Sequence, residues 1–245
     1  MSTISAAIDN AVDYGKEQAF AMALPANVAE WSDNFIAAGR NYGVSPWLLA
    51  GICYQESLGG SALTPQGPSG TGDFSKRTPG RNYGNGYVVG STGMPEDGKG
   101  WGRGLMQLDW GAQYPWCQNN PWQDPQTNIN KAAQVLQSCI NFFQASGNPL
   151  GVNIDSWRMN GLASANVQGW ASKYGLDPTS LGPFTDPRPL SGNDLAVAAL
   201  AAYNAGTSGV LQALAAGLPA DAPTAGNTYA SRIAGKVAAW LSTFG

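Results

Sequence analysis

The chain contains no histidine, and this absence excludes several common kinds of active site. A Ser-His-Asp triad, a Cys-His pair and a zinc site with histidine ligands all require an imidazole. Any acid–base chemistry must therefore come from carboxylates, tyrosines or lysines. We expect neither a metal ion nor another cofactor.

Charged residues are also scarce. They make up 12% of the 245 residues, whereas roughly 25% is usual for globular domains. The net charge is −3, and a protein that binds nucleic acid normally carries a basic surface. We therefore expect no nucleic-acid partner. The length is sufficient for a domain with a sizeable core.

The chain has only three cysteines, and no two of them form a CxxC pair. Cys53 and Cys139 lie in apolar helical patterns, which predicts buried free thiols. A disulfide that involves Cys117 stays open as an alternative.

Long hydrophobic runs are missing as well. Three acidic residues interrupt the N-terminal segment, which has no basic stretch and does not resemble a signal peptide. The apolar residues 19–24 are too few to span a bilayer, and Pro25 ends them. We therefore expect a protein that is made in the cytoplasm and does not insert into a membrane.

The apolar periodicity is mainly that of helices, and the expected fold class is mainly α. The run from Leu195 to Asn204 is small or apolar on almost every side, which is typical of a central, buried helix. Segment 59–104 is rich in Gly, Pro, Ser and Asn, and we expect it to be a functional loop or a small β element that forms a cleft. We expect a helical extension over 1–26 and one domain over 27–245. The helices are expected near residues 5–24, 27–42, 46–58, 124–143, 165–174, 195–204, 208–216 and 228–244.

A glutamate occupies an unusual place in the stretch GICYQESLGG, which covers residues 51–60. On a helix, Glu56 shares a face with Leu49, Ile52 and Cys53, and we expect that face to be buried. Burial and the negative potential at a helix C-terminus both raise the pKa of a carboxyl group, and a protonated glutamate can donate a proton to a leaving group. The alternative is a structural glutamate that bonds to a distant arginine or to backbone N–H groups.

Two further motifs follow Glu56 in the chain. They are GRGLMQLDWG at 102–111 and LAAYNAG at 200–206. With YQESLGG, this ordered set resembles the lysozyme-like superfamily of lytic transglycosylases and goose-type lysozymes. Members of that superfamily share a helix that ends in Glu-Ser, then Gly-Leu-Met-Gln, then Ala-Tyr-Asn-Ala-Gly. The resemblance covers roughly residues 28–244 and implies an α+β lysozyme-like fold.

The resemblance also implies roles for the matching residues of the first two motifs. Glu56 would be the catalytic acid, and Ser57 would hydrogen-bond the sugar next to the scissile bond. Met106 would pack on a sugar face, while Gln107 would contact N-acetyl groups.

Three residues near the C-terminus complete the implied substrate site. Tyr203 and Asn204 would flank the acid, with the tyrosine hydroxyl holding its carboxyl group in place. Tyr229 would approach the acid from the last helix. The alternative for both tyrosines is a place in the core, since Tyr229 begins an apolar stripe that continues with Ile233 and Val237.

A second carboxylate would be needed for hydrolysis, and the segment around the Gly-Leu-Met-Gln motif offers candidates. Goose-type lysozymes have a Gly-rich loop with an aspartate before this motif and another aspartate after it. Asp109 fits the second position, and Asp97 fits the first with a shift of one residue. Asp73 and Glu96 are interpreted as solvated loop carboxylates.

The same segment carries cations and tryptophans. We interpret the cations as solvated, with contact to peptide carboxylates of the cell wall as the alternative; they are Lys76, Arg77, Arg81 and Arg103. Stacking on sugars and packing under the loop are both open for Trp101, Trp110 and Trp116.

The function that the resemblance implies is cleavage of the β-1,4 bond between N-acetylmuramic acid and N-acetylglucosamine in bacterial peptidoglycan. The pattern of Asp97 and Asp109 favours goose-type hydrolysis over lytic transglycosylation, and an inactive wall-binding or virion component is a further alternative. We expect a bacteriophage lysin that is a monomer or a virion component, whose partner is the glycan strand. A holin or the virion would deliver it to the cell wall.

Overall fold

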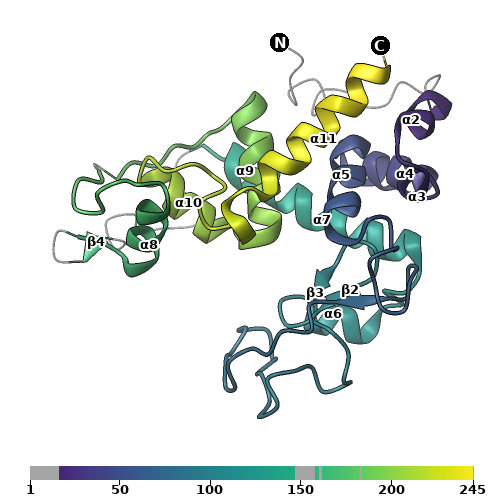
Figure 1. Cartoon of the computed structure of the whole chain (residues 1–245), viewed down its shortest axis with the longest axis horizontal. Coiled ribbons are helices and arrows are strands. Elements are labelled where there is room, and N and C mark those ends of the chain that lie inside the picture. Colours follow the sequence, from purple (N-terminus) through teal and green to yellow (C-terminus); the bar gives the residue numbers. More distant parts are fainter. Residues whose placement is uncertain (1–16, 147–157, 160–161, 183, 245) are drawn as a thin grey trace. The chain divides into compact units, whose positions relative to one another are not determined.

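The computed structural model describes residues 17–146, 158–159, 162–182 and 184–244 (Figure 1). Within these ranges the chain is mainly helical with a small three-stranded sheet, which confirms the expected mainly-α class. The described residues divide into two compact units. The N-terminal unit contains residues 17–134 and 240–244, and the C-terminal unit contains residues 135–239.

The helix that carries Glu56 is enclosed by the N-terminal unit. This helix, α5 (Pro46–Ser57), begins after Ser45 with Pro46 in its first turn, as the sequence predicts. All of its residues from Pro46 to Cys53 are buried, so the helix has no exposed face until its last turn. There Glu56 is half-buried, whereas we expected it to be buried.

Three shorter helices precede α5: α2 (Glu17–Ala23), α3 (Ala26–Ala29) and α4 (Ser32–Tyr42). Part of the helix predicted over 5–24 lies outside the described residues, and α2 is its visible end. Phe20 of α2 packs edge-on against Trp47 of α5, with ring centroids 4.6 Å apart.

The single helix expected over 27–42 is wrong, because the chain turns at Trp31 and forms α3 and α4 instead. Trp31 has φ −103° and ψ 10°, outside the helical region. Its indole N–H donates to the carbonyl oxygen of Gly59 at 3.0 Å. This contact joins the turn at Trp31 to the residues that follow α5. The apolar periodicity of residues 27–42 gives no sign of a contact so far along the chain.

The expected β element begins in segment 59–104, but its third strand lies beyond that segment. β1 (Thr71–Gly72), β2 (Gly102–Arg103) and β3 (Leu108–Asp109) form an antiparallel sheet in the order β1-β2-β3, in which Gly72 pairs with Gly102 and Gly102 with Asp109. Two helices follow, α6 (Tyr114–Asn119) and α7 (Pro125–Gln144). The sequence predicted α7 but not α6.

The Gly-rich chain between β1 and β2 shares an aromatic core with residues that follow β3. Residues 77–93 run back on themselves, with backbone hydrogen bonds that include Tyr83 N to Tyr87 O and Val89 N to Arg81 O. Asn85 at the tip donates to the carbonyl oxygens of Gly111 and Ala112. The buried cluster comprises Tyr87, Val89, Trp101, Trp110, Cys117 and Trp122.

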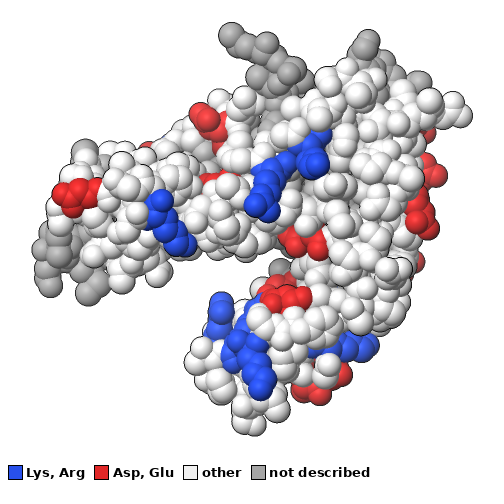
Figure 2. Space-filling view, in the orientation of Figure 1, with Lys and Arg blue, Asp and Glu red and all other residues white. Residues whose placement is uncertain are grey.

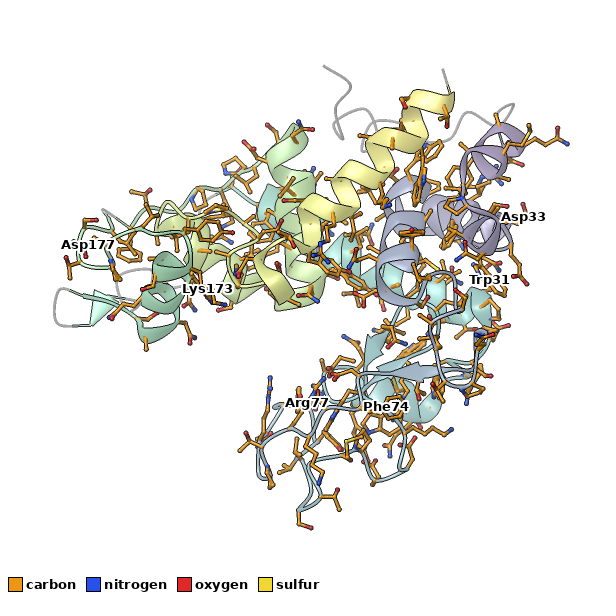
Figure 3. The ribbon with its side chains drawn as sticks, viewed as in Figure 1. Trp31, Asp33, Phe74, Arg77, Lys173 and Asp177 are labelled. Atoms are coloured by element: carbon orange, nitrogen blue, oxygen red, sulfur yellow. The ribbon has the colours of Figure 1, made fainter. Side chains whose placement is uncertain are left out.

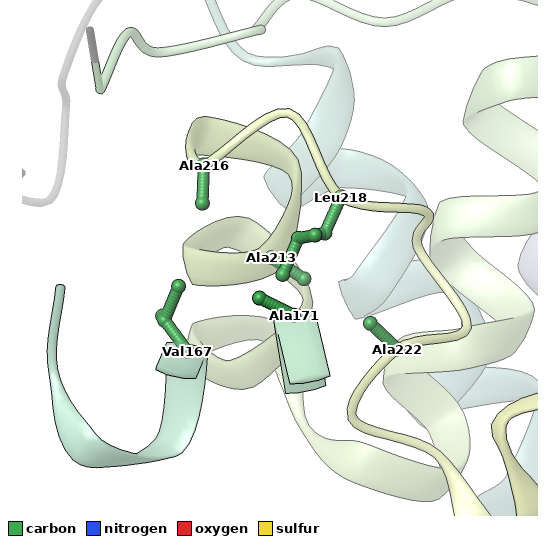
Figure 4. Close-up of a cluster of buried hydrophobic side chains, with 6 residues drawn as sticks. All are labelled: Val167, Ala171, Ala213, Ala216, Leu218 and Ala222. Atoms are coloured by element: carbon green, nitrogen blue, oxygen red, sulfur yellow. The ribbon is translucent and has the colours of Figure 1, made fainter. Parts of the chain in front are cut away.

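The C-terminal unit is built around α9 (Gly192–Ala205) and α10 (Thr207–Ala215). In α9, Leu195, Ala196 and Ala198 to Ala202 are buried, which confirms the prediction for this helix. Ala213 of α10 packs with Val167 and Ala171 of α8 (Ala165–Lys173) in a cluster of small side chains (Figure 4). α11 (Tyr229–Phe244) was also predicted.

Two short elements of this unit were not predicted. β4 (Arg158–Met159) pairs with β5 (Leu162–Ala163) before α8, and the 3-10 helix η2 (Ala225–Asn227) precedes α11. Among the described residues, no helix is both long and apolar enough to cross a membrane.

Candidate functional site

The end of α5 is joined to the Gly-Leu-Met-Gln turn through Ser57. The Ser57 side chain is 1% exposed, and its hydroxyl donates to the carbonyl oxygen of Leu105 at 2.7 Å. The hydroxyl oxygen of Ser57 also accepts a hydrogen bond from the backbone N–H of Gly60 at 3.0 Å. Ser57 was expected to bind a sugar, but its hydroxyl is used inside the protein. It therefore fixes the position of Glu56 relative to the turn.

Asn128 of α7 holds the same turn from the other side. It is 1% exposed; its side chain accepts from the backbone N–H of Met106 at 2.9 Å and donates to the carbonyl oxygen of Arg103 at 3.0 Å. Gly104 has φ +66°, and a Cβ there would lie 2.5 Å from the amide nitrogen of Asn128. Only glycine fits this close approach without a shift.

Sequence reasoning missed Asn128, although a signal exists. Asn128 lies four and eight residues before Ala132 and Leu136, which are fully buried on the apolar side of α7. A polar residue on such a face needs partners for its amide group, because burial without hydrogen bonds is unfavourable.

Gln107 and Met106 occupy different environments within the turn. Gln107 is half-buried and has φ +46°, and its amide donates to the carbonyl oxygen of Gly104 at 2.9 Å. Its amide oxygen lies over the sheet, since a Cβ on Gly72 or Gly102 would meet it at 2.3 or 2.0 Å. Met106 is fully buried, so its side chain packs in the interior and not on a surface open to a sugar.

Asp109, at the end of β3, is paired with an arginine. Its Oδ2 lies 2.6 Å from Nη2 of Arg77, and its Oδ1 accepts from the backbone N–H of Ala112 at 2.7 Å. The same Arg77 nitrogen lies 3.0 Å from Oδ2 of Asp73. Burial alone would raise the pKa of Asp73, but hydrogen bonds from Ser75 and Arg77 outweigh this effect and lower it.

Asp97 is paired with the other arginine of this region. Its Oδ1 lies 3.0 Å from Nη2 of Arg103, whose side chain is 0% exposed. The Arg103 guanidinium lies over the rings of Trp110 and Trp122, at 4.3 and 5.5 Å from their centroids. Burial lowers the pKa of Arg103, although the charge of Asp97 opposes the shift.

The interpretation of the cations as solvated is therefore wrong for Arg103. It is wrong in part for Arg77, whose side chain is only 17% exposed, and right for Lys76 and Arg81, which are exposed. In Figure 2 blue and red surfaces lie next to one another in the part of the molecule formed by these loops, as ion pairs require. Two buried tryptophans, Trp110 and Trp122, lie against the guanidinium of Arg103, whereas Arg81 has a single ring beside it, that of Tyr83, and stays exposed.

The tryptophans around the motif pack under the loop. Trp101 and Trp110 are 0% and 6% exposed, so they pack in the interior and do not stack on sugars. Trp116 is half-buried. The indole N–H of Trp110 donates to Glu96 at 3.3 Å, so Glu96 is not simply solvated. Burial and the charge of Glu96 raise the pKa of Tyr87 to about 12.

The residues of the third motif lie in the C-terminal unit. Tyr203 is half-buried and Asn204 is exposed near the end of α9, and Tyr229 is 4% exposed at the start of α11. The side-chain oxygen of Asn204 accepts from the backbone N–H of Ala225 at 3.0 Å, which holds the loop before α11. Their roles beside Glu56 stay predictions.

No protein-family model matches the chain, and no curated protein sequence is significantly similar to it. The description of the candidate site therefore rests on the geometry of this structure. Among the described residues, no three Cys, Asp or Glu side chains gather in a group that could hold a metal ion. In the N-terminal unit, Glu56 precedes Ser57, and Ser57 and Asn128 hold the Gly-Leu-Met-Gln turn in place. Asp97 and Asp109, on either side of this turn in the sequence, each pair with an arginine.

Proposed function

We propose that the protein is a peptidoglycan glycosidase and that Glu56 is its general acid. The observation that carries this proposal is the hydrogen bond from Ser57 to the carbonyl oxygen of Leu105. It ties the helix turn that carries Glu56 to the turn that, by the resemblance, receives the sugar. General acid catalysis depends on such a fixed geometry between the proton donor and the leaving oxygen.

In the proposed reaction, Glu56 donates its proton to the oxygen that joins N-acetylmuramic acid to N-acetylglucosamine. The bond between this oxygen and C1 breaks, and positive charge develops at C1 and the ring oxygen. Gln107 supplies the polar contact of the turn to the substrate, while Ser57, Asn128 and buried Met106 keep the turn in shape. Tyr203, Asn204 and Tyr229 are proposed as further substrate-binding residues on the resemblance alone.

The test is clearing of permeabilised Gram-negative cells by the wild type and by Glu56→Gln. The variant keeps the size of the side chain but cannot donate a proton, and we expect at least a hundredfold loss of activity. Glu30→Gln is the matched control, because Glu30 is an exposed glutamate of the same unit. If the wild type binds cell walls but clears no cells, the protein is a wall-binding component and the proposal fails.

The geometry favours lytic transglycosylation as the second half of the reaction. Hydrolysis of the inverting type needs a carboxylate that accepts a proton from water. Both candidates, Asp97 and Asp109, already pair with arginines. In lytic transglycosylation the substrate's own N-acetyl oxygen and 6-hydroxyl complete the reaction, and the product is a 1,6-anhydro sugar. Mass spectrometry of the digest separates the two outcomes, because anhydro products are lighter by one water.

A further inference from the structure

We propose that Arg77 determines which product the site forms, by keeping Asp109 from acting as the base for water. This inference rests on the proposed glycosidase function. Arg77 is part of the loop between β1 and β2 (Figure 3). Asp109 ends β3, so the pair joins this loop to the segment that follows the Gly-Leu-Met-Gln turn.

The Arg77 guanidinium is held on several sides. Its Nη2 lies 2.6 Å from Asp109 Oδ2 and 3.0 Å from Asp73 Oδ2, and its Nη1 donates to the hydroxyl of Tyr83. Its central carbon lies 4.1 Å from the centroid of a ring of Trp101. A planar guanidinium that is stacked on an aromatic ring and bonded at Nη1 and Nη2 has little freedom to move away from Asp109.

Trp101 is itself fixed, so the stack is rigid. Its side chain is 0% exposed and its indole N–H donates to the carbonyl oxygen of Ser75 at 2.9 Å. Its backbone N–H donates to the carbonyl oxygen of Asp73 at 2.9 Å. These contacts within the loop hold Arg77 beside Asp109, and they do not depend on bound substrate.

A general base needs a carboxylate oxygen that is open to water, and both oxygens of Asp109 already have donors. Oδ2 lies 2.6 Å from Nη2 of Arg77, and Oδ1 accepts from the backbone N–H of Ala112 at 2.7 Å. Burial by itself would lower the pKa of Arg77, but hydrogen bonds and charge attraction from Asp109, Tyr83 and Asp73 raise it instead. The arginine thus stays charged, and the pair persists.

The two reactions differ only after the C1–O4 bond has broken and Glu56 has given its proton to the leaving oxygen. In hydrolysis, a water oxygen bonds to C1, and its proton passes to Asp109. In transglycosylation, the 6-hydroxyl oxygen of the same sugar bonds to C1, and its proton returns to Glu56. The second route consumes no water and needs no further base, so it proceeds while Arg77 holds Asp109.

Removing the guanidinium tests the inference. We expect the wild type to release mainly anhydro-muropeptides and Arg77→Met to release mainly reducing-end products, since a general base accelerates its step by roughly a hundredfold or more. The double variant Arg77→Met/Asp109→Asn should return to anhydro products. Arg81→Met is the matched control: Arg81 is exposed in the same loop, and none of the described carboxylates pairs with it.

A stabilising role alone would lower the melting temperature of Arg77→Met without changing the product ratio, and that result would overturn the inference. Should Arg77→Met not fold, Asp109→Asn in the wild-type background decides. We expect Asp109→Asn to keep nearly all of the clearing activity and to release anhydro products. A large loss of clearing activity in this variant would contradict the inference. Mainly reducing-end products from the wild type would overturn the inference but keep the glycosidase. Absence of any product would overturn the proposed function itself.

Discussion

The hydroxyl of Ser57 donates to the carbonyl oxygen of Leu105 across 2.7 Å, and this bond connects two segments separated by 48 residues. One segment ends the buried helix α5 with Glu56, and the other forms the turn between β2 and β3. The bond lies in the interior, where its strength is not reduced by water. It is the contact that places a potential proton donor next to a potential sugar-binding turn.

Replacing Ser57 by Ala should therefore destabilise the protein and reduce clearing activity. The buried carbonyl oxygen of Leu105 would lose its bond to Ser57, at a cost of about 1–3 kcal/mol in unfolding free energy. The N–H of Gly60 would keep its bond to the backbone oxygen of Ser57. Urea denaturation measures the loss. Ser61→Ala is the control, because the Ser61 hydroxyl also bonds to a carbonyl oxygen, that of Leu58, but at an exposed site. Equal stabilities of the two variants would contradict the prediction.

Gly104 and Gly98 allow steric crowding to be separated from backbone strain. Both have positive φ, +66° and +70°, but a Cβ on Gly98 meets nothing within 4 Å, whereas a Cβ on Gly104 meets Asn128. Gly98→Ala should lower stability by about 1–2 kcal/mol through φ alone. Gly104→Ala should lose about 1–3 kcal/mol more through crowding. Thermal unfolding compares the two, and equal losses would show that the turn relaxes without cost.

Asp186 should stabilise the C-terminal unit in a pH-dependent way. Its carboxylate accepts three hydrogen bonds from the guanidinium of Arg188, at 2.9, 3.3 and 2.6 Å, and the Arg188 side chain is 0% exposed. Hydrogen bonds from Arg188 lower the pKa of Asp186, although burial acts in the opposite direction. Asp186→Asn should lose about 3 kcal/mol at pH 7, because a buried charge is left without its partner.

The sign of the pH effect follows from the lowered pKa. The contribution of Asp186 is fully present above the unfolded-state value of about 3.9, and it disappears as the pH falls through the folded-state pKa. Wild type and Asp186→Asn should therefore converge in stability at acid pH. Asp177→Asn serves as control, since Asp177 (Figure 3) also has a lowered pKa, caused by hydrogen bonds from Thr179, but at an exposed site without an arginine. A constant difference between wild type and Asp186→Asn over all pH values would contradict the ion-pair explanation.

The three cysteines should be unreactive in the folded protein. All are free and buried, which confirms the free thiols and excludes the disulfide considered for Cys117. Burial raises the pKa of each thiol to about 12, so hardly any thiolate is present at pH 8. A thiol reagent should label almost none in the native state and all three after denaturation. Rapid native labelling would show that a cysteine is accessible.

The helices could be predicted from the sequence because their information is local. The start of α5 at Ser45-Pro46, the apolar spacing in α7 and the small residues of α9 each lie within one turn or a few turns of the chain. The composition of segment 59–104 also predicted either a functional loop or a small β element. The break between α3 and α4 was not, because it depends on a contact from Trp31 to Gly59.

The sequence by itself limited which residues can carry acid–base chemistry. Without histidine, the candidates are carboxylates, tyrosines and lysines, and the motifs single out Glu56 among the carboxylates. The tertiary structure decided which of these carboxylates have partners. Asp109 meets Arg77 and Asp97 meets Arg103 only because the loop between β1 and β2 folds around Trp101 and Trp110. A charge in a Gly-rich segment looks solvated in sequence. Whether aromatic rings enclose it depends on residues brought together by folding, and local patterns carry no record of such contacts.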